Sequence, residues 1–314
     1  MPTLNNMQRP QPTSTPPTAV ARPWWRRLVK RLMVWYIAAM LSLFAVAYLF
    51  FAEPLRITVE EVPVAMRGWE QGCAPARVVL LADLHAGWRD AARLDLIVAR
   101  TLEQKPEAVL LLGDYFCALK PGESMPARQI AAHLAPLAKC CPVYYVCGNH
   151  DMGKPGAELR REFKKKGFVC MENSEHVLTF ANGQKLRLRG IAFVSEPLKI
   201  TPRTGRWQEQ RFAKEKLPQD MPLLVATHNP YYFLNHRLCV DLAVAGHTHG
   251  GQVCLPGGRP WVASAPWSPQ TARAGMHRNK SGCPVYVSRG LGLSRLPIRF
   301  CCPPEITVLL LQGK

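Results

Sequence analysis

The chain of 314 residues has few acidic residues for its size. It holds 22 Asp and Glu residues against 40 Lys and Arg, which gives a formal net charge of +18. This excess of positive charge favours an anionic partner, such as a phosphate ester or an acidic membrane surface. The sequence contains no Lys/Arg run with interleaved aromatic residues, so we expect no nucleic-acid partner.

The sequence also contains no two cysteines separated by two residues, the spacing of a zinc knuckle or a thioredoxin-type site. The eleven cysteines are an odd number, so they cannot all be joined in disulfides within the chain. Several, such as Cys140 and Cys302, lie beside apolar runs, where a free cysteine behaves as a small core residue. We therefore predict mostly reduced, structural cysteines.

The first 76 residues fall into three segments that differ in amino-acid composition. Residues 1–31 begin rich in Pro, Thr, Gln and Asn and end in a basic cluster, so we predict a disordered basic segment. Residues 32–52 carry no charge, and a helix of this length spans roughly 30 Å, the thickness of a bilayer core. We predict a membrane-anchor helix there, a linker over 53–76 and a catalytic domain over 77–314.

The side of the membrane that the domain faces is left open by two opposing signals. Basic residues before the apolar run predict a cytoplasmic N-terminus, which would send the rest of the chain outward. Reduced cysteines instead favour the cytoplasm, because exported proteins meet an oxidising compartment.

Short apolar runs recur along the predicted domain, and helical stretches lie between them. Such runs between turn signals are typical of buried strands. Leu94, Ile97 and Val98 have the spacing of one helix face, and residues 159–166 predict a second helix. Strands alternating with helices predict an α/β fold. The predicted strands cover 78–81, 108–112, 143–146, 223–227, 242–245, 285–288 and 306–311, with a further pair at 186–188 and 190–194.

Five of these strands are each followed at the carboxyl end by Asp, Asn or His, at the edge where α/β sheets build their sites. Carboxylate and imidazole ligands suit divalent first-row metals, and the absence of cysteine among them disfavours a closed structural zinc site. We predict a site for two divalent metal ions, manganese first, with iron or zinc as alternatives. The ligands are Asp83, His85, Asp114, Asn149, His228, His247 and His249.

Such a site has a defined chemistry. Two cations about 3.5–4 Å apart generate hydroxide from water near neutral pH and neutralise a phosphoryl group during in-line attack. No protein nucleophile is then needed, and the chain has no Gly-x-Ser-x-Gly elbow that would offer one. Arg289 follows a predicted strand, and its planar guanidinium is a candidate for binding the substrate phosphate. A surface arginine is the alternative interpretation.

The ordered motifs resemble those of the calcineurin-like metallophosphoesterase superfamily. They are Asp83-x-His85, Gly113-Asp114, Gly148-Asn149-His150-Asp151, His228 and Gly246-His247-Thr248-His249. The stretches 246–252, 286–292 and 303–306 are similar to membrane-associated bacterial phosphodiesterases of the YaeI/YkuE type. The resemblance implies a four-layer αββα sandwich of two mixed β-sheets, here preceded by one N-terminal hydrophobic membrane helix.

The resemblance also implies roles for the site residues. Asp83, His85 and His249 would hold one metal ion. Asn149, His228 and His247 would hold the other, and Asp114 would bridge the two. His150 would act at the leaving group as a catalytic residue, and Asp151 would orient it. Where many relatives carry a second acid soon after the Gly-Asp motif, this chain has Tyr115 and Phe116.

These observations together predict a dinuclear metal-dependent phosphodiesterase that hydrolyses phosphate esters by metal-activated hydroxide. The apolar N-terminal run favours a lipid-linked or amphiphilic substrate. One alternative, drawn from the resemblance, is a UDP-2,3-diacylglucosamine pyrophosphatase of lipid A biosynthesis, which requires a domain facing the cytoplasm. A second alternative is a membrane-tethered, non-catalytic binding protein. The oligomeric state stays unknown.

Overall fold

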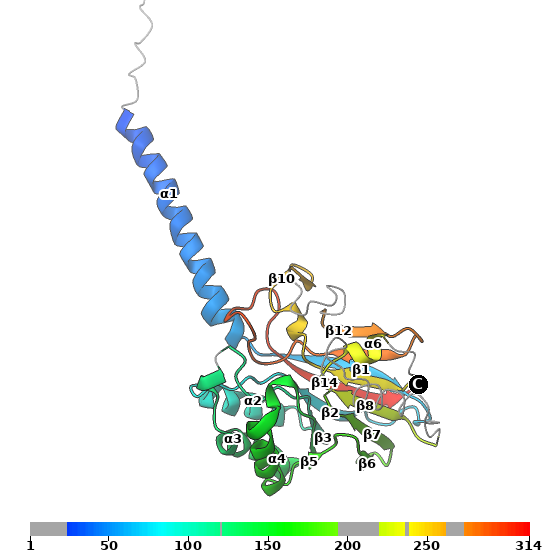
Figure 1. Cartoon of the computed structure of the whole chain (residues 1–314). Coiled ribbons are helices and arrows are strands. Elements are labelled where there is room, and N and C mark those ends of the chain that lie inside the picture. Colours follow the sequence, from blue (N-terminus) through cyan, green and yellow to red (C-terminus); the bar gives the residue numbers. More distant parts are fainter. Residues whose placement is uncertain (1–23, 120, 194–219, 236–238, 262–272) are drawn as a thin grey trace, which may run out of the picture. The chain divides into compact units, whose positions relative to one another are not determined.

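The computed structural model describes residues 24–119, 121–193, 220–235, 239–261 and 273–314. The chain divides into two compact units, residues 1–46 and 47–314. The described part of the first unit is helical and belongs to α1, Trp24–Ala47, whose last residue is counted in the second unit (Figure 1). The disordered segment predicted over 1–31 therefore lies outside the described residues as far as residue 23, and the residues from Trp24 onward are helical.

Helix α1 begins earlier than the apolar run that predicts it. Its first turns include the basic cluster, because arginine and lysine are good helix formers. None of its side chains is buried within the structure. The stretch Trp24–Leu55 has a mean hydropathy of 2.1 in its most apolar window, so it is long and apolar enough to cross a membrane.

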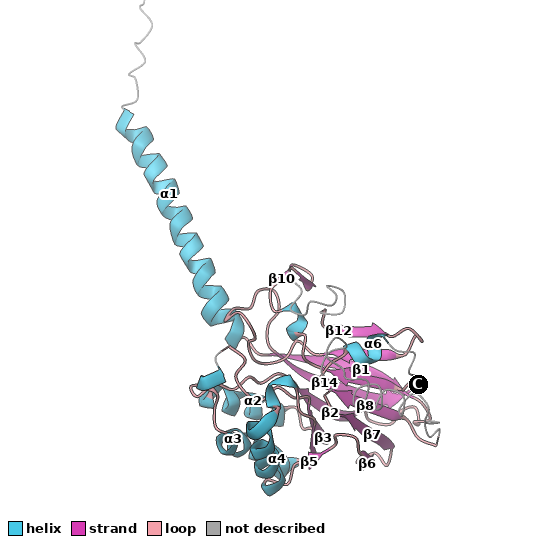
Figure 2. Ribbon diagram, in the orientation of Figure 1, coloured by secondary structure: helices cyan, strands magenta, loops and turns pink. Residues whose placement is uncertain are grey.

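The second unit is built on two six-stranded mixed sheets (Figure 1, Figure 2). In the first sheet the order is β1-β14-β2-β3-β4-β5. Strands β1 and β14 are parallel to each other, and β14 is antiparallel to β2, so the two run against the other four. The bounds are β1 Thr58–Met66, β2 Ala76–Leu81, β3 Ala108–Leu111, β4 Val143–Tyr145, β5 Val169–Cys170 and β14 Glu305–Gly313.

In the second sheet the order is β12-β13-β9-β8-β7-β6. The four central strands are parallel, and each edge strand is antiparallel to its neighbour. The bounds are β6 Glu175–Thr179, β7 Lys185–Ile191, β8 Leu223–Thr227, β9 Leu242–Ala245, β12 Gly275–Arg278 and β13 Pro284–Val287. A separate two-stranded hairpin joins β10 Cys254–Leu255 to β11 Arg259–Pro260.

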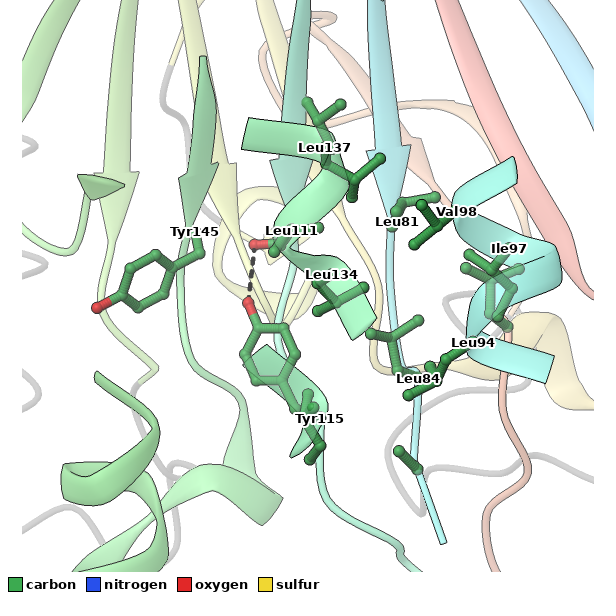
Figure 3. Packing of buried hydrophobic residues seen from close by; sticks show 14 of the residues in the cluster. Leu81, Leu84, Leu94, Ile97, Val98, Leu111, Tyr115, Leu134, Leu137 and Tyr145 are labelled. Atoms are coloured by element: carbon green, nitrogen blue, oxygen red, sulfur yellow. Dashed lines mark hydrogen bonds between the residues drawn. The ribbon is translucent and has the colours of Figure 1, made fainter. Parts of the chain in front are cut away.

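Side chains alternate between the two faces of each strand, so one apolar face of each sheet packs against the other sheet. Leu80 and Leu110 of the first sheet face Leu188 and Val244 of the second in one buried cluster. The opposite face of the first sheet is covered by α2 Ala91–Glu103, α3 Ala127–Cys140 and α4 Gly153–Lys165. Figure 3 shows leucines of α2 and α3 packed on β2 and β3, beside Tyr115.

The outer face of the second sheet carries a short helix, α6 Tyr231–Asn235. Phe233 of this helix is fully buried and packs with Val225 and Val287. The layers therefore follow the order helix, sheet, sheet, helix, and the predicted four-layer α/β fold is confirmed.

The seven main predicted strands are present as β2, β3, β4, β8, β9, β13 and β14, while the pair predicted at 186–194 forms the single strand β7. Eight of the described helices and strands were not predicted: β1, β5, β6, β10, β11, β12, α3 and α6. Strand β1 lies within the stretch predicted as a linker, and its Pro63 is tolerated because β1 is an edge strand. Helix α3 contains Pro136, which ordinarily argues against a helix.

One disulfide joins Cys239 to Cys283, and nine cysteines are free. The two bonded residues lie far apart in sequence, but they precede β9 and β13, which are parallel neighbours. Their Cα atoms are 5.5 Å apart. The prediction of mostly reduced cysteines therefore has this one exception.

Candidate metal centre

Strand ends from both sheets deliver polar side chains to one place. Asp83, His85 and His249 are buried, and their possible ligand atoms all lie within 4.8 Å of one another. The Nε2 atoms of His85 and His249 are 3.1 Å apart, and the two rings are stacked. These three side chains form the first ligand cluster.

The second ligand cluster consists of Asp114, His228 and His247, whose possible ligand atoms also lie within 4.8 Å of one another. The Oδ1 of Asn149 lies 3.1 Å from Nε2 of His228, and Nδ1 of His247 lies 3.0 Å from the same atom. The structure thus brings together all seven residues that the sequence predicts as ligands.

Asp114, a member of the second ligand cluster, also reaches the first. Its Oδ2 atom lies 3.6 Å from Nε2 of His85 and 3.3 Å from Nε2 of His228. Its Oδ1 atom accepts a hydrogen bond of 2.9 Å from the backbone amide of His150. One carboxylate oxygen is therefore fixed by the backbone, and the other faces an imidazole from each cluster.

Backbone carbonyls set the orientation of two imidazoles. Nδ1 of His85 donates to the carbonyl of Phe116 at 2.8 Å, and Nδ1 of His228 donates to that of Leu112 at 2.8 Å. Because Nδ1 carries the proton, Nε2 of a neutral ring presents its lone pair to the centre. Buried Nδ1 of His249 has no hydrogen-bond partner among the described residues. This donor set fits divalent metal ions.

Burial determines the protonation of most of these rings. It lowers the pKa of His85 to about 4 and that of His247 to about 3, and it holds the pKa of His249 well below the ordinary value. Neutral imidazole is the form that binds a metal. Burial alone would raise the pKa of Asp114, but His228 and His85 bring it below its ordinary value.

The backbone at the strand ends adopts an unusual conformation. Left-handed φ angles at non-glycine residues cost free energy and gather at functional sites, where the surrounding structure holds them. Five of the seven clustered residues adopt this conformation. It occurs at Asp83 (54°), His85 (43°), Asp114 (58°), His247 (70°) and His249 (53°).

Close backbone approach requires glycine beside two of the carboxylates. A Cβ atom on Gly148 would lie 2.1 Å from Oδ1 of Asp114. One on Gly246 or on Gly290 would lie 2.7 Å from Oδ2 of Asp83. Any side chain at these positions would displace the carboxylate that it meets.

The Asp151 carboxylate is buried and accepts three backbone hydrogen bonds. Its donors are the amides of Asp114 at 2.7 Å, Tyr115 at 2.8 Å and Gly148 at 2.8 Å. The sequence-based expectation was that Asp151 orients His150. The structure shows a carboxylate that fixes the two loops carrying Asp114 and Asn149, and the orienting of His150 by Asp151 stays a prediction.

The structure pairs Arg289 with two carboxylates, and its contact with the substrate phosphate stays a prediction. Its Nε lies 2.9 Å from a carboxylate oxygen of buried Glu305, and its Nη2 lies 3.1 Å from one of Glu60. The guanidinium therefore binds strands β1 and β14 rather than joining the ligand clusters.

Arg299 was missed by the sequence analysis. It is fully buried and donates to the backbone carbonyls of Arg289, Gly290, Gly292 and Cys302. The same loop approaches Asp83, because the amide of Gly292 donates to the carbonyl of Asp83. Arg299 thus supports the first ligand cluster through the loop, and an isolated arginine has no sequence signal for such a role.

A substitution at Gly148 tests the close packing of the centre. We expect Gly148→Ala to lower the metal affinity of the purified protein by roughly 10- to 100-fold, because the new methyl group displaces Asp114. The control is Gly122→Ala, whose Cβ would meet nothing within 4 Å. Metal content after dialysis at a fixed metal concentration gives the measurement. Equal metal content in the two variants would contradict the packing described.

Comparison with known proteins agrees with this geometry. The sequence profile of the calcineurin-like phosphoesterases matches residues 76–251, more than half of the chain and a range that contains all seven clustered residues. The uncharacterized metallophosphoesterase YkuE of Bacillus subtilis is 27% identical over 274 residues, which cover 85% of this chain and 89% of that protein.

Two further relatives agree. The phosphodiesterase YaeI of Escherichia coli is 30% identical over 249 residues, which cover 77% of this chain and 84% of that protein. A transmembrane protein with metallophosphoesterase domain from Danio rerio is 26% identical over 302 residues, which cover 94% of this chain and 64% of that protein. The predicted resemblance and enzyme class are confirmed: the chain belongs to the calcineurin-like phosphoesterase family, the metal-dependent hydrolases of phosphate esters.

Proposed function

We propose that this phosphoesterase is a membrane-anchored phosphodiesterase that uses two manganese ions to hydrolyse a lipid-linked or otherwise amphiphilic phosphate ester. The observation that carries the proposal is the pair of ligand clusters joined by one oxygen of Asp114. Asp83, His85 and His249 would hold one ion, and Asn149, His228 and His247 would hold the other. Asp114 would contact both.

When bound, two divalent ions supply an activated water and neutralise charge on the phosphoryl group. The protein supplies fixed positions for the ligands. Backbone carbonyls hold the rings of His85 and His228. The backbone amide of His150 holds Asp114, and that of His247 holds the Asp83 carboxylate at 2.9–3.0 Å.

His150 is the residue proposed to act on the leaving group. Its backbone is tied to Asp114, while its ring lies edge-on to that of His85, with centroids 5.1 Å apart. The ring is half-buried and stands outside both ligand clusters. A proton held on this imidazole would reach the oxygen of a departing alcohol beside the centre.

The lipid-linked substrate is supported by the N-terminal helix. Trp24, Trp25, Trp35 and Tyr36 are exposed on the helix near the basic residues, as in helices whose ends lie at a membrane interface. A helix anchored in this way keeps the enzyme at the membrane surface. The net charge of +18 would favour anionic lipids and anionic headgroups there.

Two features favour a domain that faces outward. One is the basic cluster before the anchor helix, and the other is the disulfide. The basic cluster precedes the apolar stretch, which predicts a cytoplasmic N-terminus. A disulfide such as Cys239–Cys283 forms and persists in oxidising compartments. A UDP-2,3-diacylglucosamine pyrophosphatase would need the opposite orientation.

The proposed metal dependence is tested by diester hydrolysis. We expect the purified full chain to cleave a chromogenic diester, to lose this activity with a chelator and to regain it with Mn²⁺. Asp114→Asn should lower kcat/KM by roughly a thousandfold, because both clusters lose their shared ligand. The control is Asp95→Asn, an exposed carboxylate that pairs with His133.

UDP-2,3-diacylglucosamine is assayed in parallel with the chromogenic diester. Preference for it would overturn the outward-facing assignment. A chain that neither binds Mn²⁺ nor cleaves any diester would refute the proposal and favour the non-catalytic binding protein.

Replacement of His150 separates proton donation from metal binding. We expect His150→Ala to keep its metal content and to lose roughly 10²- to 10⁴-fold in kcat on an alkyl diester, whose leaving group needs a proton. On a nitrophenyl diester the loss should be much smaller. The control is His133→Ala, which removes a ring whose Nδ1 lies 2.6 Å from a carboxylate oxygen of exposed Asp95. Full turnover of the alkyl diester by His150→Ala would remove His150 from the mechanism.

Reporter fusions after Lys314 test the orientation. We expect a fused alkaline phosphatase to be active and a fused green fluorescent protein to be dark, because the first needs an oxidising compartment and the second fails to fold when exported unfolded. The opposite pattern would place the domain in the cytoplasm.

A further inference from the structure

A cavity of about 380 Å³ opens beside His150, within the range of small-molecule sites. Phe116, Met125 and Ala127 are the buried residues of its lining. Pro126, Lys154, Pro155 and Glu158 are exposed. We refer to it as the Phe116 cavity; its full lining is Phe116, Cys117, Ser124, Met125, Pro126, Ala127, His150, Lys154, Pro155 and Glu158.

The Phe116 cavity shares two residues with the surroundings of the metal centre. The carbonyl of Phe116 accepts the hydrogen bond from Nδ1 of His85, while Phe116 also lines the cavity. His150 lines the cavity, and its ring contacts that of His85. A group in the cavity would therefore lie on the same side of the centre as the proposed proton donor.

The walls of the cavity are fixed before any ligand arrives. Residue Phe116 forms a β-bridge with Ala86, and Ser124 forms one with Gly87. The amide of Met125 donates to the carbonyl of Ala86 at 2.9 Å, and the amide of Cys117 donates to the Ser124 hydroxyl at 3.0 Å. A pre-formed site saves the ordering cost of binding and selects by shape.

The chemistry of the lining indicates the occupant. The buried residues are apolar, and the Ser124 hydroxyl already accepts a hydrogen bond from the amide of Cys117, so this part of the lining offers few partners for the hydroxyl groups of a sugar. The rim carries one cation, Lys154, and one anion, Glu158, so it favours neither an anionic nor a cationic ligand. An uncharged apolar group fits this combination best.

We propose that the Phe116 cavity binds an apolar leaving group of the phosphate ester, with Met125 and Ala127 as specificity-determining residues. This inference rests on the proposed phosphodiesterase function. It predicts that the enzyme distinguishes its substrates by the group that departs rather than by the group that stays on phosphorus.

Three diesters with a nitrophenolate leaving group test this inference on the full chain with Mn²⁺. The first carries a methyl group as its second ester, the second adds a butyl chain to the nitrophenyl ring, and the third has butyl in place of methyl. We expect kcat/KM to rise roughly tenfold for the second diester over the first, but not for the third.

Two variants change the cavity in opposite directions. Ala127→Leu narrows it and should abolish the butyl preference, so that kcat/KM becomes equal for the first and second diesters. Met125→Ala widens it and should shift the preference toward a longer ring substituent. The control is Ala157→Leu, an exposed position of α4 that is not part of the lining.

The outcomes separate the two claims. Hydrolysis of all three diesters with no preference for the ring substituent, or with a preference that both cavity variants leave unchanged, would overturn the cavity assignment alone. Failure to hydrolyse any of them would overturn the proposed function as well.

Discussion

The Asp114 carboxylate is the group that the rest of the centre is arranged to hold. A buried carboxylate is costly unless each oxygen has a partner. Here Oδ1 takes a backbone amide, and Oδ2 faces His85 and His228 from the two clusters. Gly148 leaves room for it, and the amide of Asp114 itself is fixed by Asp151.

The two-sheet architecture explains how one carboxylate reaches both clusters. Asp83 and Asp114 follow strands of the first sheet, and His228 and His247 follow strands of the second. The core between the sheets fixes their distance, and the bond from His228 to the Leu112 carbonyl joins their edges. Buried Arg299 then holds the loop that closes over Asp83. The core between the sheets, the loop held by Arg299 and the positions of the ligand side chains therefore depend on one another.

The sequence predicted most of the sheets and the ligand set because both have local signals. A buried strand is an apolar run, and a ligand at its end is the polar residue that follows. Strand β1 and helix α3 each contain a proline, which argues against a strand or a helix at that position. Arg299, Asp151 and the partners of Arg289 depend on contacts between distant segments, which residue spacing does not encode. The Cys239–Cys283 disulfide likewise follows from the pairing of β9 with β13.

We propose that two metal ions share Asp114. Crystals grown with Mn²⁺ and measured at the manganese absorption edge test it most directly. We expect two anomalous peaks, one at Asp83, His85 and His249 and one at Asn149, His228 and His247, with Asp114 contacting both. A single peak, or two peaks of which only one touches Asp114, would contradict it.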